Sequence, residues 1–568
     1  MAISTITTRR LPVRIPRTPE GFYEFSLPAG HVPIHDPAIA EENGVYYIFG
    51  THRRFARSTD LVNWEPLNNN LTDDFETLLG PIWKQWPQVG LNGSPLSGNT
   101  WAPDVIFNPT MGKWCMYLSV NGENYQSVIV LLTADHLEDD WQYVGPVIYS
   151  GFKPENVRKT DVPRVLGKEA TGPLARYQSL KDSHINAIDA APVTDERGDM
   201  WMSFGSWFGG LWMIRLDPET GLRDYETTYP LVKDASDPYY GIKIGGGYGN
   251  SGEGSYFLHA NGWWYLMLSY GGLGRTGGYQ IRVFRSRELT GPYVDQAGNP
   301  AVSHGEIADN WTGKTGVRLL ASVAWNGGSA KSPSANPAKA APEGKAILPD
   351  WGGVEISQGH NSALAREDGR MFMVYHTRFI GRDDNDYETR VRELYTTADG
   401  WLVAAPYEYQ GSLGIAPHTP AEIADISGDY ELVCLRQDTY FDGTRNADGR
   451  WHGVNTPVHI RLRPDGRVSA TNLQTLISAG LIDDDVSVAS ADGTVTCGLW
   501  RLSGDGHALD ARDETETGEI CGNGSMRITL GTLTYTGVFV TLPRESDGKP
   551  AMTFSAVGNN LCIWGARC

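Results

Sequence analysis

The 568-residue sequence predicts an all-β protein: a five-bladed β-propeller followed by a smaller all-β domain of sandwich or barrel-like form. Two observations support this fold class. The chain contains 66 Gly, 26 Tyr and 18 Trp, a composition typical of many short strands joined by tight turns. One segment design also recurs five times along the first three quarters of the chain, and such recurrence is the sequence signature of repeat architectures.

Each of the five segments has a polar head residue, a short apolar strand, a turn glycine and a second strand rich in aromatic residues. The head residues are Asp36, Asp104, Asp189, Glu253 and His360. The turn glycines, eight or nine residues after the heads, are Gly44, Gly112, Gly198, Gly262 and Gly369. Each glycine lies in an N-G, M-G, R-G or D-G pair, which we interpret as a hairpin turn. Successive heads lie 64 to 107 residues apart, which leaves room for the four strands of a propeller blade.

The same pattern divides the chain into regions. We expect an N-terminal extension over residues 1–29, the propeller over 30–409, a linker over 410–424 and a C-terminal β-domain over 425–568. The linker is predicted from the Gly/Pro-rich stretch QGSLGIAPHTPAE. Alternating runs such as HIRLRP and TYTGVFVTL indicate strands after it. We expect this last domain to support the propeller or to contact carbohydrate.

Net charge and hydropathy indicate which classes of binding partner the protein can have. The net charge of −19 argues against nucleic acid and against an anionic membrane surface, so a neutral ligand is expected. The sequence contains no apolar run of about 18 residues that could span a membrane. The first residues carry charges but no apolar secretory core, so we expect a cytoplasmic protein. A secreted protein whose signal peptide is absent from the sequence as given is the alternative. We expect a monomer.

The head residues indicate catalysis. In a propeller the innermost strand of each blade lines a central channel, so five heads on five inner strands converge on one cavity. Carboxylates that converge raise one another's pKa, which is costly unless the site uses it. The alternative is that each Asp only caps a strand or turn. Five aligned heads favour the catalytic interpretation over that one.

Several short motifs point to a known family. In chain order they are His35-Asp36-Pro37, Trp101-Ala102-Pro103-Asp104-Val105, Asn186-Ala187-Ile188-Asp189, Gly205-Ser206-Trp207-Phe208-Gly209-Gly210, Ser269-Tyr270-Gly271-Gly272-Leu273, Ile281-Arg282-Val283-Phe284-Arg285-Ser286, Gly359-His360-Asn361-Ser362 and Tyr375-His376-Thr377-Arg378-Phe379. Through these motifs residues 30–410 resemble glycoside hydrolase family 43, and within it the endo-α-1,5-L-arabinanases. The end of the chain, with Ile563-Trp564-Gly565, is similar to the extra C-terminal β-domain of the larger arabinanases.

The resemblance implies a role for each matching residue. Asp36 would be the general base that activates water, Glu253 the general acid, and Asp189 the residue that tunes the pKa of the acid. His360 would help to hold one calcium ion in the central channel, largely through water. The residues implied to bind substrate are Trp101, Asn186, Ala187, Ile188, Ser206, Trp207 and Phe208.

The implied reaction is inverting hydrolysis of α-1,5-L-arabinofuranosidic bonds in arabinan or arabino-oligosaccharides, with endo action. Inversion requires an ionised and a protonated carboxyl group about 6.5–9.5 Å apart, with room for water between them. Long stretches before His184 and before Gly359 depart from the family pattern and could close one end of a groove. Exo-acting α-L-arabinofuranosidase or β-xylosidase action on the same fold therefore stays open, as does a propeller that only binds carbohydrate.

Overall fold

The computed structural model describes the chain from residue 30 onward, with gaps. The described residues are 30–87, 98–122, 125–167, 177, 185–247, 251–303, 315–325, 354–380, 385–416, 425–436, 441–444, 451–470, 472–478, 481–482, 495–502, 524–545 and 548–568. The expected N-terminal extension (1–29) and half of the expected linker (417–424) lie outside these ranges.

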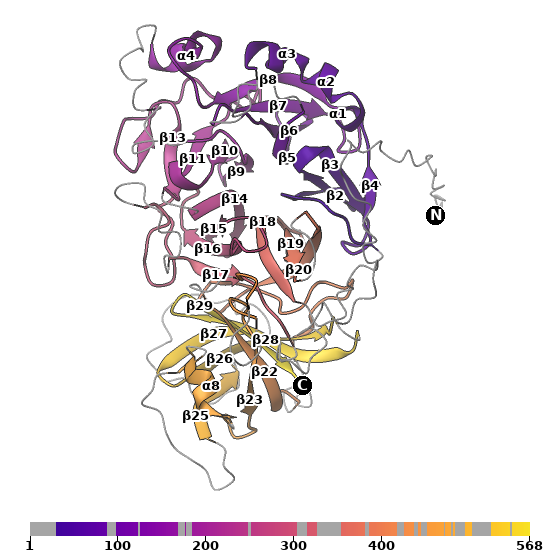
Figure 1. Ribbon diagram of the computed structural model, residues 1–568, viewed down its shortest axis with the longest axis vertical. Helices are drawn as coiled ribbons and strands as arrows, with labels where there is room; N and C mark the ends of the chain where they lie inside the picture. The colour runs from indigo at the N-terminus through magenta and orange to yellow at the C-terminus, as the bar shows by residue number, and fades with distance from the viewer. Residues whose placement is uncertain are drawn as a thin grey trace.

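Five antiparallel sheets are arranged around a central channel (Figure 1). Blade 1 contains β1 (Ala38–Glu42), β2 (Val45–Gly50), β3 (Arg54–Ser58) and β4 (Glu65–Leu67). Blade 2 contains β5 (Thr100–Asn108), β6 (Lys113–Val120), β7 (Val128–Ala134) and β8 (Gln142–Tyr149). Blade 3 contains β9 (Ala191–Thr194), β10 (Met200–Gly205), β11 (Leu211–Arg215), β13 (Gly241–Gly245) and β12 (Ser236–Asp237). The propeller prediction is confirmed.

Blade 4 contains β14 (Ser251–Ala260), β15 (Trp263–Tyr270), β16 (Gln280–Ser286) and β17 (Val317–Leu320). Blade 5 contains β18 (Glu355–Ala365), β19 (Met371–Phe379), β20 (Tyr387–Thr396) and β21 (Leu402–Ala404). Short helices lie between strands: η1 (Thr51–Arg53), α1 (Asn70–Asp73), α2 (Phe75–Leu78), α3 (Gly80–Gln85), η2 (Val157–Lys159), α4 (Val162–Leu166) and η3 (Trp207–Gly209). None of the described helices is long and apolar enough to cross a membrane.

The turn glycines join the first two strands of every blade. All five have positive φ, between 63° and 86°. At Gly44 an added Cβ would meet nothing within 4 Å, so backbone conformation and not space selects glycine there. The tight pairing of Glu42 with Val45 on either side of this turn fixes the register of blade 1.

A second backbone feature recurs where the inner strands begin. Each blade has, at or near the start of its inner strand, a residue with a left-handed backbone: Asp36, Ala102, Asp189, Gly254 and His360, with φ between 37° and 58°. For a residue other than glycine this conformation costs about 1–2 kcal/mol. By this backbone criterion the repeat begins at Ala102 in blade 2, two residues before Asp104, and at Gly254 in blade 4, one residue after Glu253. Register shifts in β5 and β14 account for these offsets.

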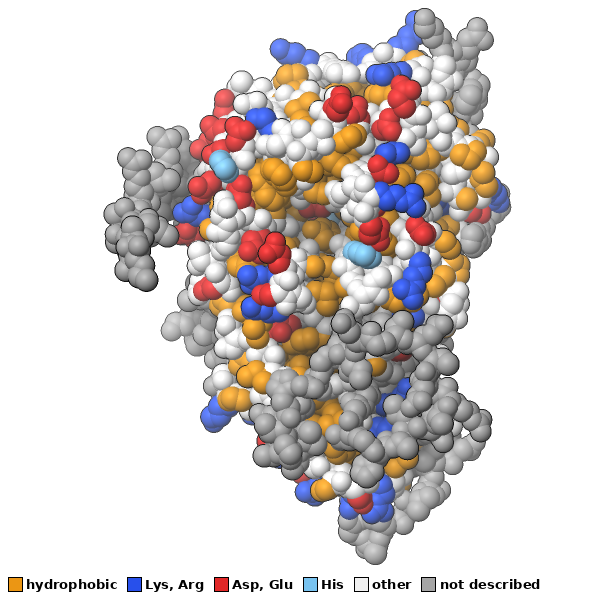
Figure 2. All heavy atoms as spheres, turned by 180° about the vertical axis from the view of Figure 1, so that it is seen from behind, with side chains coloured by type: hydrophobic (Ala, Val, Ile, Leu, Met, Phe, Trp, Pro, Cys, Tyr) orange, Lys and Arg blue, Asp and Glu red, His pale blue; other side chains and the backbone are white. Residues whose placement is uncertain are grey.

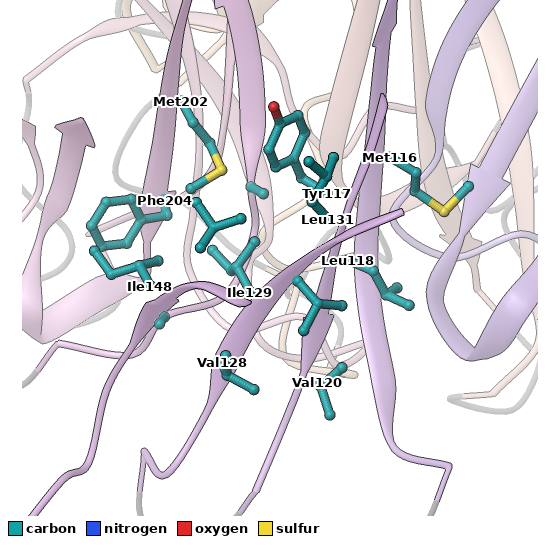
Figure 3. Packing of buried hydrophobic residues seen from close by; sticks show 14 of the residues in the cluster. Met116, Tyr117, Leu118, Val120, Val128, Ile129, Leu131, Ile148, Met202 and Phe204 are labelled. Carbon is teal, nitrogen blue, oxygen red and sulfur yellow. The ribbon is translucent and has the colours of Figure 1, made fainter. Parts of the chain in front are cut away.

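The inner strands pack side by side around the ring, β1 against β5, β5 against β9, β9 against β14, β14 against β18 and β18 against β1. Between blades the core is apolar; Ile129 and Leu131 of blade 2 lie toward Met202 and Phe204 of blade 3, whereas Met116 lies on the opposite face of the blade 2 sheet (Figure 3). A cavity of about 870 Å³ opens at one end of the channel and is lined by residues of all five inner strands. From behind, Figure 2 shows hydrophobic and charged side chains around a hollow over the middle of the propeller.

Because each blade is one continuous segment, the ring closes through contacts between the start of the chain and blade 5. Thr389 donates through its backbone to the carbonyl of Val32 (2.9 Å) and through its hydroxyl to that of Ile34 (3.0 Å). The backbone N–H of Ile39 donates to the Ser362 hydroxyl (3.0 Å). These bonds hold blade 1, and with it Asp36, against blade 5.

The C-terminal domain is a closed eight-stranded barrel, so of the two expected forms the barrel is correct. Its strands are β22 (Gly428–Leu435), β23 (Val458–Leu462), β24 (Arg467–Ala470), β25 (Val495–Leu502), β26 (Ser525–Leu530), β27 (Leu533–Pro543), β28 (Pro550–Gly558) and β29 (Leu561–Arg567), with α8 (Leu473–Ser478) after β24. Large side chains, among them Tyr430, Phe539 and Phe554, fill its interior. Trp564 is fully buried and stacks on Trp325 of the propeller side (6.4 Å between ring centroids). The barrel therefore packs tightly against blades 4 and 5.

The cysteines that the structure describes carry no disulfide. Cys115, Cys434, Cys497 and Cys562 are buried free thiols, and Cys568 is an exposed one.

Candidate active site

Three carboxyl groups from three blades meet at the channel. Asp36 precedes β1, Asp189 precedes β9, and Glu253 lies in β14; all three are buried. A small chamber beside them is lined by Asp36, Asp189, Gly254 and His360 together with neighbouring residues of all five inner strands. Inner-strand heads on separate blades therefore converge, which is the arrangement that the repeat predicted.

Asp36 lies among hydrogen-bond donors. The hydroxyl of Thr51 donates a short hydrogen bond to its Oδ2. Its Oδ1 lies 2.7 Å from His35 Nδ1 and 3.1 Å from His360 Nδ1. Burial alone would raise the pKa of Asp36, but the neighbouring His35 and then His360 hold it well below its usual range. Asp36 is thus ionised at neutral pH.

The partners of Asp36 are themselves held in place. The backbone N–H of Ala102 donates to the Thr51 hydroxyl (2.9 Å), so that this hydroxyl directs its own proton to Asp36. The backbone N–H of Asp36 donates to Nδ1 of His376 (3.3 Å), which requires that nitrogen to be unprotonated. His376 stacks on His35 with ring centroids 3.8 Å apart. Burial lowers the pKa of His376 well below its usual value, in agreement with a neutral ring.

Glu253 has the opposite protonation state. The Tyr279 hydroxyl donates to Oε1 (2.6 Å) and the Ser206 hydroxyl donates to Oε2 (3.1 Å). Burial is the largest influence and, with the negative charge of Asp36, raises the pKa of Glu253 to about 8, although the two hydroxyl donors act in the other direction. Glu253 is therefore largely protonated at neutral pH, as a general acid must be.

Asp189 lies next to this acid. Its Oδ2 accepts from the backbone N–H of Gly254 (3.4 Å), the residue after Glu253, and its own N–H donates to the Ser119 hydroxyl (3.0 Å). Burial and then the charges of Glu253 and Asp36 raise the pKa of Asp189 well above its usual value. The three carboxyl groups thus act on one another electrostatically.

The residues expected to bind substrate differ in their distance from the acid and in their burial. Ser206 and Trp207 lie beside Glu253, and both side chains influence its pKa. Ala187 and Ile188 are buried, and the N–H of Ala187 donates to the Ser150 hydroxyl (2.8 Å). Three expected residues, Trp101, Asn186 and Phe208, are only partly buried. Substrate contact stays a prediction for all seven residues.

The chamber also has groups suited to a metal ion. His360 reaches Asp36 through Nδ1, which leaves Nε2 for another partner. Asn361 beside it is buried, and its Oδ1 has no hydrogen-bond partner among the described residues. Asp104 accepts from the N–H of Val105 (2.8 Å) through one oxygen only. Oxygen donors of this kind suit calcium, so the residues present fit the ion.

One cluster could suggest a different metal. His35, Asp36 and His376 place potential ligand atoms within 4.8 Å of one another. Nδ1 of His376, however, already accepts from Asp36, and the two rings are stacked on each other. The cluster is therefore explained by its own hydrogen bonds.

Sequence reasoning missed Thr51 and Tyr279. Thr51 lies 15 residues from Asp36 with no motif around it, and Tyr279 reaches Glu253 across 26 residues. His376 was within a recognised motif, but nothing in its spacing indicates contact with Asp36, 340 residues away. The contact of His376 depends on how blades 5 and 1 pack, and the contacts of Thr51 and Tyr279 depend on how the strands within one blade pair.

Comparison with known proteins agrees with this geometry. Residues 165–324 match the model of glycosyl hydrolases family 43, and residues 406–565 match the C-terminal lipocalin-like domain named for that family. The extracellular endo-α-(1→5)-L-arabinanase of Thermotoga petrophila is 32% identical over 449 residues, 77% of this chain and 80% of that protein. The chain belongs to glycosyl hydrolase family 43.

Further relatives cover nearly the whole chain. The extracellular endo-α-(1→5)-L-arabinanase 2 of Bacillus subtilis is 29% identical over 554 residues, 94% of this chain and 93% of that protein. The crystal structure of the Thermotoga petrophila endo-1,5-α-L-arabinanase superposes with a TM-score of 0.67 at 26% identity, covering 96% of this chain and 99% of that one. A family 43 member from Bacillus licheniformis gives the same TM-score at 26% identity, covering 95% and 99%. The propeller and the barrel thus occur together in this glycosyl hydrolase family.

Proposed function

We propose that this glycosyl hydrolase is an inverting endo-α-1,5-L-arabinanase. The observation that carries the proposal is a pair of buried carboxyl groups in opposite surroundings: Asp36 lies among hydrogen-bond donors that favour its ionised form, whereas burial and the charge of Asp36 favour the protonated form of Glu253. Inverting glycoside hydrolysis requires one carboxyl group in each state. The names of the two relatives that cover most of this chain support arabinan as substrate and endo as mode of action.

In the proposed reaction Asp36 removes a proton from water as the water attacks the anomeric carbon. Glu253 gives its proton to the glycosidic oxygen, so that the leaving sugar departs neutral while positive charge develops on the furanose ring. The donors around Asp36 keep it ionised before attack. The hydroxyls of Ser206 and Tyr279 stabilise the Glu253 carboxylate that remains after proton transfer.

Asp189 is proposed to tune and orient the acid. Its contact with the N–H of Gly254 ties it to the backbone of the acid-bearing strand. The mutual influence of Asp189 and Glu253 on protonation supports this role, because two nearby carboxyl groups resist simultaneous ionisation.

We also propose that a calcium ion binds in the channel chamber, near His360 and Asn361. The unpartnered Oδ1 of Asn361 and the carboxyl groups of the chamber support this site. A calcium ion would supply positive charge beside the carboxyl groups. Chelation followed by thermal unfolding tests the site: removal of calcium should lower the melting temperature, and calcium should restore it. An unchanged melting temperature with no metal by elemental analysis would refute it.

The product profile on linear α-1,5-arabinan tests the function. Endo action predicts a ladder of oligosaccharides at early times, whereas arabinose as the sole early product would refute endo action. The Glu253→Gln variant should lose activity on the polymer, and this loss separates true activity from contamination. Compartment and oligomeric state stay predictions from the sequence.

A further inference from the structure

Tyr279 is a buried residue that contacts the acid. It directly precedes β16, it is 1% exposed, and its hydroxyl lies 2.6 Å from Glu253 Oε1. Burial and then the charge of Glu253 raise the pKa of Tyr279 well above its usual value, so the phenol keeps the proton that it donates in its hydrogen bond to Glu253. No part of the reaction proposed above fixes which oxygen of Glu253 carries the acidic proton.

The Tyr279 hydroxyl has a second polar group near it, the hydroxyl of Ser269. The backbone N–H of His360 donates to that hydroxyl (2.7 Å). Ser269 lowers the pKa of Tyr279, as a donor to the phenol oxygen does. Ser269 therefore links the backbone of His360 on blade 5 to the tyrosine that contacts the acid on blade 4.

The ring of Tyr279 is held as firmly as its hydroxyl. It stacks on His376, with centroids 5.7 Å apart and 21° between planes. On blade 5 it lies directly against the backbone of Gly359, where an added Cβ would overlap the ring. His376 accepts from the N–H of Asp36, so Tyr279 lies between the acid and the strand that carries the base.

We infer that Tyr279 is a positioning residue: its hydrogen bond to Oε1 of Glu253 (2.6 Å) is shorter than that of Ser206 to Oε2 (3.1 Å), and this difference places the acidic proton on Oε2. The inference rests on the proposed role of Glu253 as acid. During cleavage the proton moves from Oε2 to the glycosidic oxygen, and the C–O bond breaks with its electrons on that oxygen. Tyr279 then stabilises the carboxylate left on Glu253, together with Ser206.

The Tyr279→Phe variant tests this inference, since it removes the hydroxyl and keeps the ring. We expect kcat/KM on linear arabinan to fall about 10- to 100-fold, which is part of the 10²–10⁴-fold that general acid catalysis contributes. The loss should be much smaller on an arabino-oligosaccharide with a nitrophenyl leaving group, which needs no proton from the acid. Tyr265→Phe is the matched control, because Tyr265 is fully buried in the same blade and its hydroxyl donates to the carbonyl of Gly400 (2.8 Å).

The pH profile of kcat/KM of the Tyr279→Phe variant distinguishes a positioning role from a merely structural role. The hydroxyl of Tyr279 lowers the pKa of Glu253, opposing burial and the charge of Asp36. Ser206 and Trp207 also lower this pKa, and the neighbouring Asp189 interacts with Glu253 electrostatically. Without Tyr279 the alkaline limb of kcat/KM should therefore move to higher pH. A cavity that only admits water would favour the charged form and move this limb to lower pH.

Gly359→Ala provides a second route to the same result, since the methyl group must displace the Tyr279 ring. An alkaline limb that stays in place or moves down in Tyr279→Phe, or equal losses on both substrates, would overturn the inference. Glu253→Gln is measured in parallel. If that variant keeps its activity on arabinan, the proposed acid is wrong; if it loses activity while Tyr279→Phe has the unaltered profile, only the inference about Tyr279 fails.

Discussion

The junction between propeller and barrel yields a stability prediction that can be worked out from its contacts. Arg392, on β20, is 1% exposed and its Nη2 lies 2.7 Å from Oε1 of Glu355, which is also 1% exposed. The guanidinium also donates to the Tyr375 hydroxyl (2.8 Å) and lies 3.6 Å from Glu545 of the barrel. Both carboxylates would be left without this partner in Arg392→Met.

Removing one partner of a buried ion pair typically costs about 3–5 kcal/mol, because an uncompensated charge stays in a medium of low dielectric. We therefore expect Arg392→Met to lower the free energy of unfolding of the propeller by about that amount in urea denaturation. The matched control is Arg57→Met, whose ion pairs with Glu65 (2.8 Å) and Glu138 (2.9 Å) are exposed. For such a surface pair about 0–1 kcal/mol is expected.

The double variant Arg392→Met/Glu355→Gln should recover part of the loss, because the second change removes one buried charge. Equal and small losses for Arg392→Met and Arg57→Met would refute the reasoning that the buried network sustains the junction. Recovery is measured as an interaction energy between the two sites, since contacting residues are not additive.

Three further predictions concern the site. In wild-type enzyme kcat/KM on arabinan should fall as pH rises through about 8, because the deprotonated Glu253 cannot act as acid; a profile flat to pH 10 would contradict this. Thr51→Val should move the acidic limb to higher pH, because Asp36 loses a donor that favours its charged form, whereas Thr51→Ser should retain the original limb. Asn361→Leu should reduce the chelator-dependent change in melting temperature, if Oδ1 faces the calcium ion; a change as large as in wild type would exclude that contact.

The propeller could be predicted from the sequence because its determinants are local. Each turn glycine has the positive φ that an N-G or D-G hairpin requires, and the strand beside it follows within two residues. The alignment of Asp104 with the other heads was offset by two residues, because the register shift in β5 inserts residues that a fixed spacing cannot reveal. The left-handed backbone at Ala102 marks the true equivalent position.

The remaining features depend on long-range packing. Alternating strands are compatible with a sandwich and with a barrel, and only the pairing of β22 with β29, more than 120 residues apart, closes the barrel. Thr51 contacts Asp36, and Tyr279 contacts Glu253, from a different loop or strand. No spacing in the sequence predicts either contact. The contact of Arg392 with Glu545 likewise forms only when barrel and propeller meet.

The assignment of Asp36 as base and Glu253 as acid is tested most directly by measuring the activity of Asp36→Asn and Glu253→Gln. Two substrates are needed, linear arabinan and an arabino-oligosaccharide with a nitrophenyl leaving group. Both variants should lose activity on arabinan by about 10²–10⁴-fold, the range of acid–base catalysis. On the nitrophenyl substrate Glu253→Gln should retain most of its activity, because the leaving group departs without a proton, while Asp36→Asn should stay inactive. Activity of Asp36→Asn on either substrate, or equal losses of Glu253→Gln on both, would contradict the assigned roles.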